Sequence, residues 1–299
     1  LLDRLDLIDL LIQELSKKLE SPLPANIKSS SPSSTGLAYL IVGTFPNLQD
    51  SSKFRVVPEL CYGEATPSNS GRESLVQEDC SVSIEDFPKF LGKIVAFAEQ
   101  KIDRRYDPRP WKLRISLSLP TTALGSPLFQ WCGESSPLPG QHPIVVGCSD
   151  RVNPDYPRRF HLYNRLKFGW ERFFRPQRPL KELNWLITGE SSQEDWETYE
   201  AVQCWGRWLR CHQAAVERWY KLIESGIPLA LWLDEDCPNA NAIAQTFTRL
   251  TNCCHEEFLD RVRSERRGSD SIPFGVFYEN PNYLPTVAET SEEQFFSWG

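Results

Sequence analysis

The fold is decided by a short apolar run that ends abruptly, HPIVVGCSDR at residues 142–151. Three further runs of this kind lie along the chain: LRISLSLP at 113–120, GIPLALWLDED at 226–236 and IPFGVFYENPNYLP at 272–285. Each is rich in β-branched, leucine and aromatic residues and stops at proline or polar residues, which is typical of a buried strand. Helical patterns separate the runs. The sequence therefore predicts an α/β domain with a mixed, mainly parallel sheet flanked by helices.

Apolar residues recur at helical spacing between these runs. This pattern predicts helices over residues 84–102, 160–174, 193–224 and 239–263. Two more strands are expected at residues 37–44 and 54–62, as a hairpin at a sheet edge, because Pro58 has no N–H to donate to a strand ladder. Residues 183–188 fit either a short strand or a helix-capping contact.

The N-terminal segment predicts a separate element. Residues 1–20 place leucine and isoleucine at alternating spacings of four and three, which indicates an amphipathic helix that packs on its own domain, on a partner or on an upstream domain. A Ser/Pro-rich linker is expected at residues 21–36, the main α/β domain at 37–285 and an acidic tail at 286–299. Since the chain contains no methionine, we expect a processed chain or a fragment of a longer protein.

Composition limits the classes of function. The 299 residues, 40% of them hydrophobic, suffice to bury one large core, and the net charge of −7 argues against coating nucleic acid or an anionic membrane by bulk charge. The nine cysteines show no regular spacing, which favours a reducing compartment. The longest apolar run, residues 37–42, is far shorter than the roughly 20 residues that span a bilayer. We expect a cytoplasmic protein.

The order of the blocks carries a family resemblance. SLSLP, an aromatic pair before a proline-rich loop, PIVVGCSDRV, RLKFGWERFF, GIPLALWL and ENPNYLP together resemble the C-terminal domain of vWA-MoxR-associated proteins, over about residues 37–285. The resemblance implies a component of a bacterial conflict (antiviral defence) system with a von Willebrand A (vWA) protein, a MoxR-type AAA+ ATPase and an upstream effector or protease module as partners. Three positions depart from the family pattern. Asp234 stands where relatives tend to have arginine, and Glu279 and Asn280 stand where relatives tend to have an aspartate pair.

Acidic residues follow three of the predicted strands. Asp234, Glu235 and Asp236 follow one strand, Glu279 follows another and Asp150 a third. Because Mg²⁺ prefers oxygen ligands, a site of Asp234, Asp236 and Glu279 would indicate a metal-dependent, nuclease-like hydrolase. No lysine is placed as nuclease motifs usually require, and acidic strand ends also cap helices or face solvent. The hydrolase is therefore the alternative interpretation.

Cysteine and histidine form no complete motif. Cys148 and His142 lie at opposite ends of one predicted strand, roughly 20 Å apart, so they cannot form a catalytic dyad. The Cys-His neighbours at 211–212 and 253–255 lack the usual zinc spacing, and GxSxG, GxxxxGK[ST] and GxGxxG are absent. The leading interpretation therefore assigns no cofactor, no metal and no catalytic residue.

The strongest charge pattern lies in and after the predicted helix at 160–174. Residues 158–181 carry one acid, Glu171, and eight bases: Arg158, Arg159, Arg165, Lys167, Arg172, Arg175, Arg178 and Lys181. Residues 182–200 then carry six acids and no base. The interleaved aromatic residues allow stacking of nucleic-acid bases, which makes a nucleic-acid sensor a second alternative. The acids can instead neutralise the bases within the molecule or across an interface.

We predict that these eight bases bind a protein partner. The tryptophans of the predicted helix at 193–224 either pack in the core or extend this contact surface: Trp196, Trp205, Trp208 and Trp219. The function expected is that of a non-enzymatic regulatory or adaptor domain, whose N-terminal helix connects to an effector.

Overall fold

The computed structural model describes residues 35–63, 71–76, 80–124, 141–175, 178–188, 196–204, 213–233, 240–268 and 274–286. The strands are β1 (Gly36–Pro46), β2 (Lys53–Tyr62), β3 (Arg72–Ser74), β4 (Cys80–Ser83), β5 (Trp111–Leu119), β6 (Ile144–Cys148), β7 (Trp185–Thr188), β8 (Ala201–Cys204), β9 (Leu229–Leu233) and β10 (Phe274–Tyr278). The helices are α2 (Phe87–Tyr106), α3 (Thr121–Leu124), α5 (Arg159–Phe173), α6 (Gln213–Glu224), α7 (Ala240–Thr251) and α8 (His255–Arg267). Short 3-10 turns are η2 (Ser149–Arg151), η3 (Leu180–Glu182), η4 (Trp196–Thr198) and η5 (Pro281–Tyr283).

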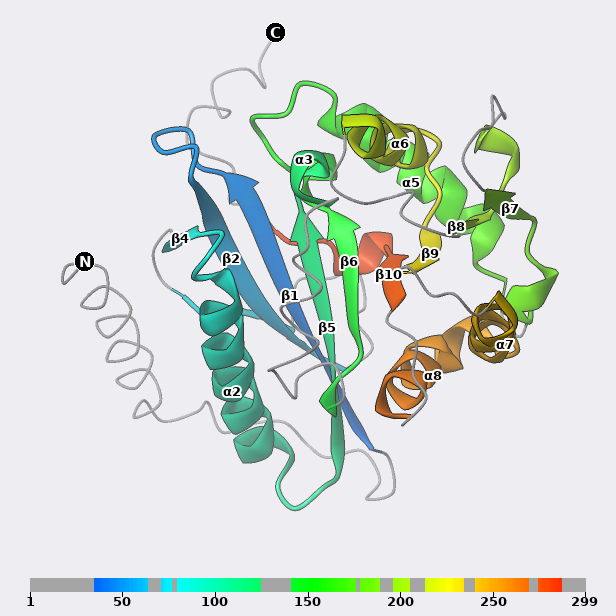
Figure 1. Ribbon diagram of the computed structural model, residues 1–299. Coiled ribbons are helices and arrows are strands. Elements are labelled where there is room, and N and C mark those ends of the chain that lie inside the picture. The colour runs from blue at the N-terminus through cyan, green and yellow to red at the C-terminus, as the bar shows by residue number, and fades with distance from the viewer. Residues whose placement is uncertain are drawn as a thin grey trace, which may run out of the picture.

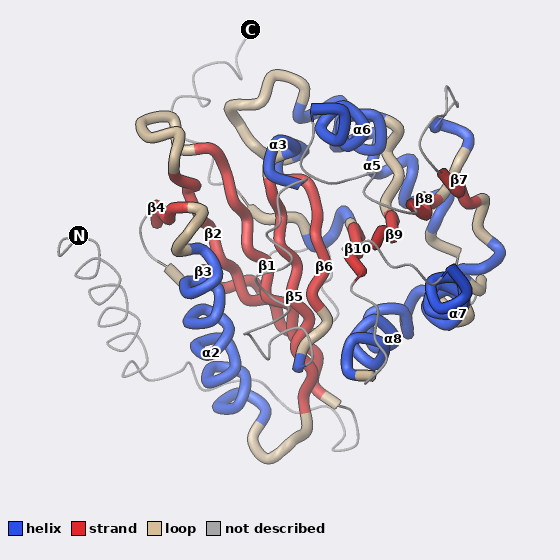
Figure 2. Tube along the Cα trace, in the orientation of Figure 1, coloured by secondary structure: helices blue, strands red, loops and turns tan. Residues whose placement is uncertain are grey.

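The strands form one mixed sheet with helices on both faces (Figures 1 and 2). Its order is β3-β2-β1-β5-β6-β10-β9-β8-β7, and β4 also pairs with β2. The four apolar runs that predict strands become β5, β6, β10 and β9, which are neighbours at the centre of the sheet. The predicted α/β fold with a mixed, mainly parallel sheet is confirmed.

The direction of the strands reverses once in the middle of the sheet. β1, β5, β6 and β10 run parallel to one another, β9 runs antiparallel to β10, and β8 and β7 continue parallel to β9. The carboxyl ends of β6 and β10 therefore lie at the same end of the strands of the sheet. The carboxyl end of β9 lies at the opposite end.

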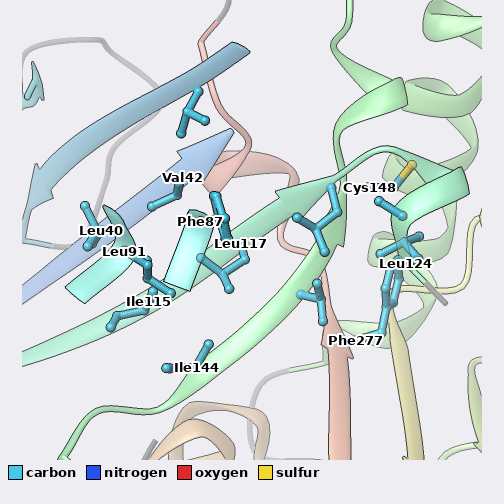
Figure 3. Close-up of a cluster of buried hydrophobic side chains, with 14 of the residues drawn as sticks. Leu40, Val42, Phe87, Leu91, Ile115, Leu117, Leu124, Ile144, Cys148 and Phe277 are labelled. Carbon is cyan, nitrogen blue, oxygen red and sulfur yellow. The ribbon is translucent and has the colours of Figure 1, made fainter. Parts of the chain in front are cut away.

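Alternate residues of the central strands face opposite helical layers, as the two-residue period of a strand requires. Val146 of β6 packs in the cluster under α2, α3 and α6, whereas its neighbour Val145 packs in the cluster under α5, α7 and α8. Figure 3 shows part of the first cluster, with these labelled members: Leu40, Val42, Phe87, Leu91, Ile115, Leu117, Leu124, Ile144, Cys148 and Phe277.

Pro58 lies where two short strands meet the outer side of β2. β1 and β2 form the predicted hairpin, but β2 is one strand in from the edge. β4 pairs with residues 53–56 and β3 with residues 59–61, so the break between them falls at Pro58, which lacks an N–H.

Two predicted helices differ from the structure. The segment predicted as one helix at 193–224 contains η4, then strand β8, then α6 from Gln213, because β8 gains ladder partners on both sides, β7 and β9. Tertiary pairing here overrides the helical spacing of the tryptophans. The segment predicted at 239–263 is divided into α7 and α8. Residues 183–188, which fit either a strand or a capping contact, contain strand β7.

The predicted N-terminal helix and the linker up to residue 34 lie outside the described residues, as does the tail from residue 287. Within the described part of the chain, no helix combines the length and apolar character that a membrane crossing requires.

Candidate functional site

The carboxyl ends of β6 and β10 hold a buried ion pair. Glu279 follows β10 and is 2% exposed. Its Oε2 accepts a hydrogen bond from Nε of Arg151 at 2.7 Å, and its Oε1 accepts one from the backbone N–H of Cys148, also at 2.7 Å. Gly147 leaves room for this carboxylate, since a Cβ there would lie 3.0 Å from Glu279 Cγ. Glu279 is thus held from three sides in the interior.

Arg151 connects this pair to helix α5. Its Nη1 donates to the carbonyl of Leu162 at 2.6 Å, and its side chain is fully buried. Burial raises the pKa of Glu279, and the positive charge of Arg151 acts against that rise. The guanidinium is what makes a carboxylate tolerable at this depth.

Asp150 also binds its neighbours rather than an open site. Its Oδ2 accepts hydrogen bonds from the N–H of Thr121 at 3.0 Å and from Oγ1 of Thr121 at 2.6 Å, at the start of α3. The Sγ of Cys148 lies 3.4 Å from the same Oγ1. Burial raises the pKa of the Cys148 thiol far above its ordinary value, so the thiol stays protonated and is a poor nucleophile.

The proposed carboxylate site is not assembled by the described strands. Asp234 and Asp236 themselves lie outside the described residues. Leu233, which precedes them, pairs with Phe274 at the start of β10, whereas Glu279 follows the other end of β10, about 17 Å away at 3.4 Å per residue. A shared Mg²⁺ would require the chain after Leu233 to return along that length. Among the described residues, no group of three or more His, Cys, Asp or Glu side chains is placed to hold a metal ion.

His142 lies at the opposite end of β6 from Cys148, as predicted. Its Nε2 is 2.8 Å from Oε1 of Glu99 on α2, and its ring stacks near Trp111. Histidine and cysteine therefore belong to different clusters and do not form a dyad.

Several of the predicted partner-binding bases contact acids of the same molecule. Arg165 Nη2 lies 3.0 Å from Glu197 Oε1, and Arg172 Nη1 donates to the carbonyl of Glu197 at 2.6 Å. Arg158 pairs with Glu224. Other bases of the segment contact uncharged groups. Lys181 donates a hydrogen bond to the side chain of Asn252. The Arg159 guanidinium lies over the Phe160 ring, and the Lys167 ammonium lies over the Tyr163 ring. The acidic stretch thus neutralises part of the basic segment within the molecule.

Arg178 makes the most complete of these pairs. Its Nη1 and Nη2 donate to the two carboxylate oxygens of Glu200 at 2.8 and 2.9 Å. The Glu200 carboxylate also accepts from the backbone N–H of Asn184. Burial raises the pKa of Glu200, but the bonds from Arg178 and Asn184 outweigh it, and the pKa lies below its ordinary value.

We expect the Glu200→Gln variant to lose stability at pH 6 and to lose less at pH 3. Because the folded-state pKa of Glu200 is lowered from 4.5, its contribution is present above the unfolded pKa and is lost as the pH falls through the folded one. Urea denaturation of wild type and variant at both pH values measures this. An equal difference in unfolding free energy at pH 6 and pH 3 would contradict the assignment.

The family is decided by one comparison. The family model of the vWA-MoxR associated protein C-terminal domain, VMAP-C, matches residues 52–281, from the residue before β2 to the first residue of η5. The chain belongs to the VMAP-C family. The resemblance read from the order of the sequence blocks is therefore confirmed, and the domain's name links it to vWA-MoxR associated systems. Searches of curated proteins and of solved structures gave no match.

Sequence reasoning missed a division among the aromatic residues of α5 in this VMAP-C domain. Trp170 and Phe173 are buried against β10 and α8, while Phe160 and Phe168 point to solvent. The available signal was the phase of the helix. Phe160 and Phe168 lie outside the buried stripe that Leu162 starts and that continues at four-residue spacing.

Proposed function

We propose that this VMAP-C domain is a non-enzymatic regulatory or adaptor domain of a bacterial conflict system, which binds a vWA-domain protein and a MoxR-type AAA+ ATPase. Membership of the family supports the class of partner. In this proposal the domain acts in the cytoplasm, and its N-terminal segment connects it to an effector or protease module.

One structural observation carries the non-enzymatic part of the proposal. α/β enzymes present catalytic groups at the carboxyl ends of parallel strands. Here Glu279, Asp150 and Cys148 occupy those ends and are buried in contacts with Arg151 and Thr121. Groups that face the interior and bind one another stabilise the fold and are not accessible to a substrate.

The proposed contact surface is the basic segment, and its members differ in how they can be tested. Reversing the charge of Arg178 would break its pair with Glu200, so lost binding could reflect lost folding. Lys167 and Arg175 are exposed and make no ion pair within the described residues. The Arg175 charge acts on Glu200 and the Lys167 ammonium lies over Tyr163, but reversing these two charges breaks no ion pair of the described residues.

We expect the Lys167→Glu/Arg175→Glu variant to bind the two partners with an association rate constant several-fold lower and with weaker salt dependence, because exposed charges mainly steer encounter. Biolayer interferometry at two salt concentrations measures this, with a purified vWA-domain protein and a purified MoxR-type ATPase as the two partners. Lys89→Glu, on the exposed side of α2, is the matched control. Unchanged kinetics in the double variant would remove this surface, and failure of the wild-type chain to bind either partner would contradict the proposed function.

A further inference from the structure

Helix α5 presents two phenylalanine rings to solvent on one face. Phe160 is 68% exposed and Phe168 is 65% exposed. Single exposed apolar residues are ordinary on a protein surface. The other large apolar side chains exposed in the described part of the chain are isolated on separate elements: Leu48, Ile84 and Ile187. Two aromatic rings on one helix therefore stand apart from this background.

Five of the exposed positions of α5 form a continuous strip, here called the α5 outer face: Phe160, Asn164, Lys167, Phe168 and Glu171. Their spacings of three, four and eight residues put them on one side of the helix. The two rings are about 12 Å apart along the axis at 1.5 Å per residue. That separation matches two turns of a partner helix and suits recognition through repeated apolar anchors.

The helix cannot turn this face inward. On its opposite side Leu162 is 2% exposed and Leu166 is fully buried. The Leu162 carbonyl accepts a hydrogen bond from the buried side chain of Arg151. Gly169 approaches Gly226, ahead of β9, so closely that a Cβ would lie 1.8 Å from the Gly226 oxygen. The packing fixes the rotation of α5, and with it the exposure of Phe160 and Phe168.

Charge around the rings selects the kind of partner. α5 carries four cationic side chains, Arg159, Arg165, Lys167 and Arg172, and one carboxylate, Glu171. The Arg159 guanidinium lies 4.6 Å from the centre of the Phe160 ring, so the aromatic surface is bordered by positive charge. A surface with apolar anchors and a cationic border complements a segment with apolar side chains flanked by carboxylates.

Nucleic acid fits this surface less well. A phosphate backbone needs a run of cations that are available to phosphate. Arg165 and Arg172 already hold Glu197, and Glu171 lies between the two cationic sides of the outer face. Among the described residues, the outer face itself then offers a single cation, Lys167, which can meet one carboxylate of a partner helix but not the run of phosphates in an extended backbone.

We infer that the α5 outer face binds an acidic amphipathic helix of a partner protein, with Phe160 and Phe168 as the apolar anchors. The inference rests on the proposed function and names the chemistry of the segment that is recognised. Two aromatic anchors that become buried in the complex supply most of the binding energy expected at such a site. The bordering charges set the orientation of the partner helix and the association rate.

The test is the Phe160→Ala/Phe168→Ala variant of the full chain. We expect its affinity for the vWA-domain protein or the MoxR-type ATPase of the proposed function to fall at least about tenfold. Leu48→Ala, at a residue 82% exposed in the turn between β1 and β2, is the matched control and is expected to bind like wild type. Both variants are expected to melt like wild type, since the side chains removed are exposed. A photo-cross-linking phenylalanine analogue at position 168 is expected to label an acidic segment with apolar residues at helical spacing.

The outcomes separate this inference from the proposed function. Wild-type binding that survives in the double variant would overturn the α5 outer face and leave the adaptor function standing. Absence of wild-type binding to both partners would overturn the adaptor function itself. Binding of a single-stranded 20-mer oligonucleotide, in a gel shift that the double variant abolishes, would overturn the acidic helix in favour of nucleic acid.

Discussion

The Glu279→Gln variant is expected to unfold with a free energy about 3–5 kcal/mol lower than wild type, because it removes the charge that compensates buried Arg151. Glutamine keeps the size of the side chain and an oxygen that can accept from the Cys148 N–H. The loss therefore measures the uncompensated guanidinium rather than a cavity. Urea denaturation followed by circular dichroism at neutral pH gives the number.

The control removes both charges at once. A well-packed apolar pair in place of a buried ion pair is often neutral or stabilising, so Arg151→Met/Glu279→Leu is expected to recover most of the loss. The same variants test the hydrolase alternative. If Glu279 instead served as a Mg²⁺ ligand, Glu279→Gln would leave stability unchanged, and calorimetry would show Mg²⁺ binding by wild type that the variant lacks.

The role of Glu279 shows where sequence reasoning stops. Its place at a strand end followed correctly from the pattern of apolar residues and stops, since that pattern is local. Its partner Arg151 is 128 positions earlier in the chain. The local spacing of apolar residues does not predict that β6 and β10 are neighbours, or that β9 runs antiparallel to β10. Sequence alone therefore groups the acids at three strand ends, and only the strand pairing shows that β9 runs opposite to β6 and β10. The site of Asp234, Asp236 and Glu279 stays a prediction.

Local pattern also misled where pairing partners decide. The tryptophan spacing at 193–224 fits a helix, and only the presence of β7 and β9 on either side makes residues 201–204 a strand. Conversely, the helix predicted at 160–174 is confirmed as α5, because its apolar residues at helical spacing form one face that meets the core. The exposure of Phe168 was open, since an aromatic residue next to lysine fits either a core or a surface.

The Gly169→Ala variant is expected to lower the unfolding free energy by about 3 kcal/mol, although alanine is the better helix former. Propensity alone would stabilise α5 by about 0.5–1 kcal/mol. The steric contact decides the sign of the change in unfolding free energy, because the new Cβ would lie 1.8 Å from the carbonyl oxygen of Gly226. That oxygen belongs to the backbone, and Gly226 itself packs against α5 so closely that a Cβ on it would lie 2.1 Å from the carbonyl oxygen of Arg165. The helix or the segment before β9 must shift.

The Gly92→Ala variant separates helix propensity from the steric contact, because it makes the same glycine-to-alanine change in a helix without the contact. Gly92 lies inside α2, and no atom lies within 4 Å of the place that a Cβ would take there, so the variant is expected to gain about 0.5–1 kcal/mol. Denaturation of both variants in urea gives opposite signs if the Gly169–Gly226 contact fixes α5. Because this contact also sets the direction of Phe160 and Phe168, Gly169→Ala is expected to weaken partner binding while Gly92→Ala leaves it unchanged. Stabilisation by both substitutions would show that α5 does not rest on Gly226, and the orientation argued for its outer face would go with it.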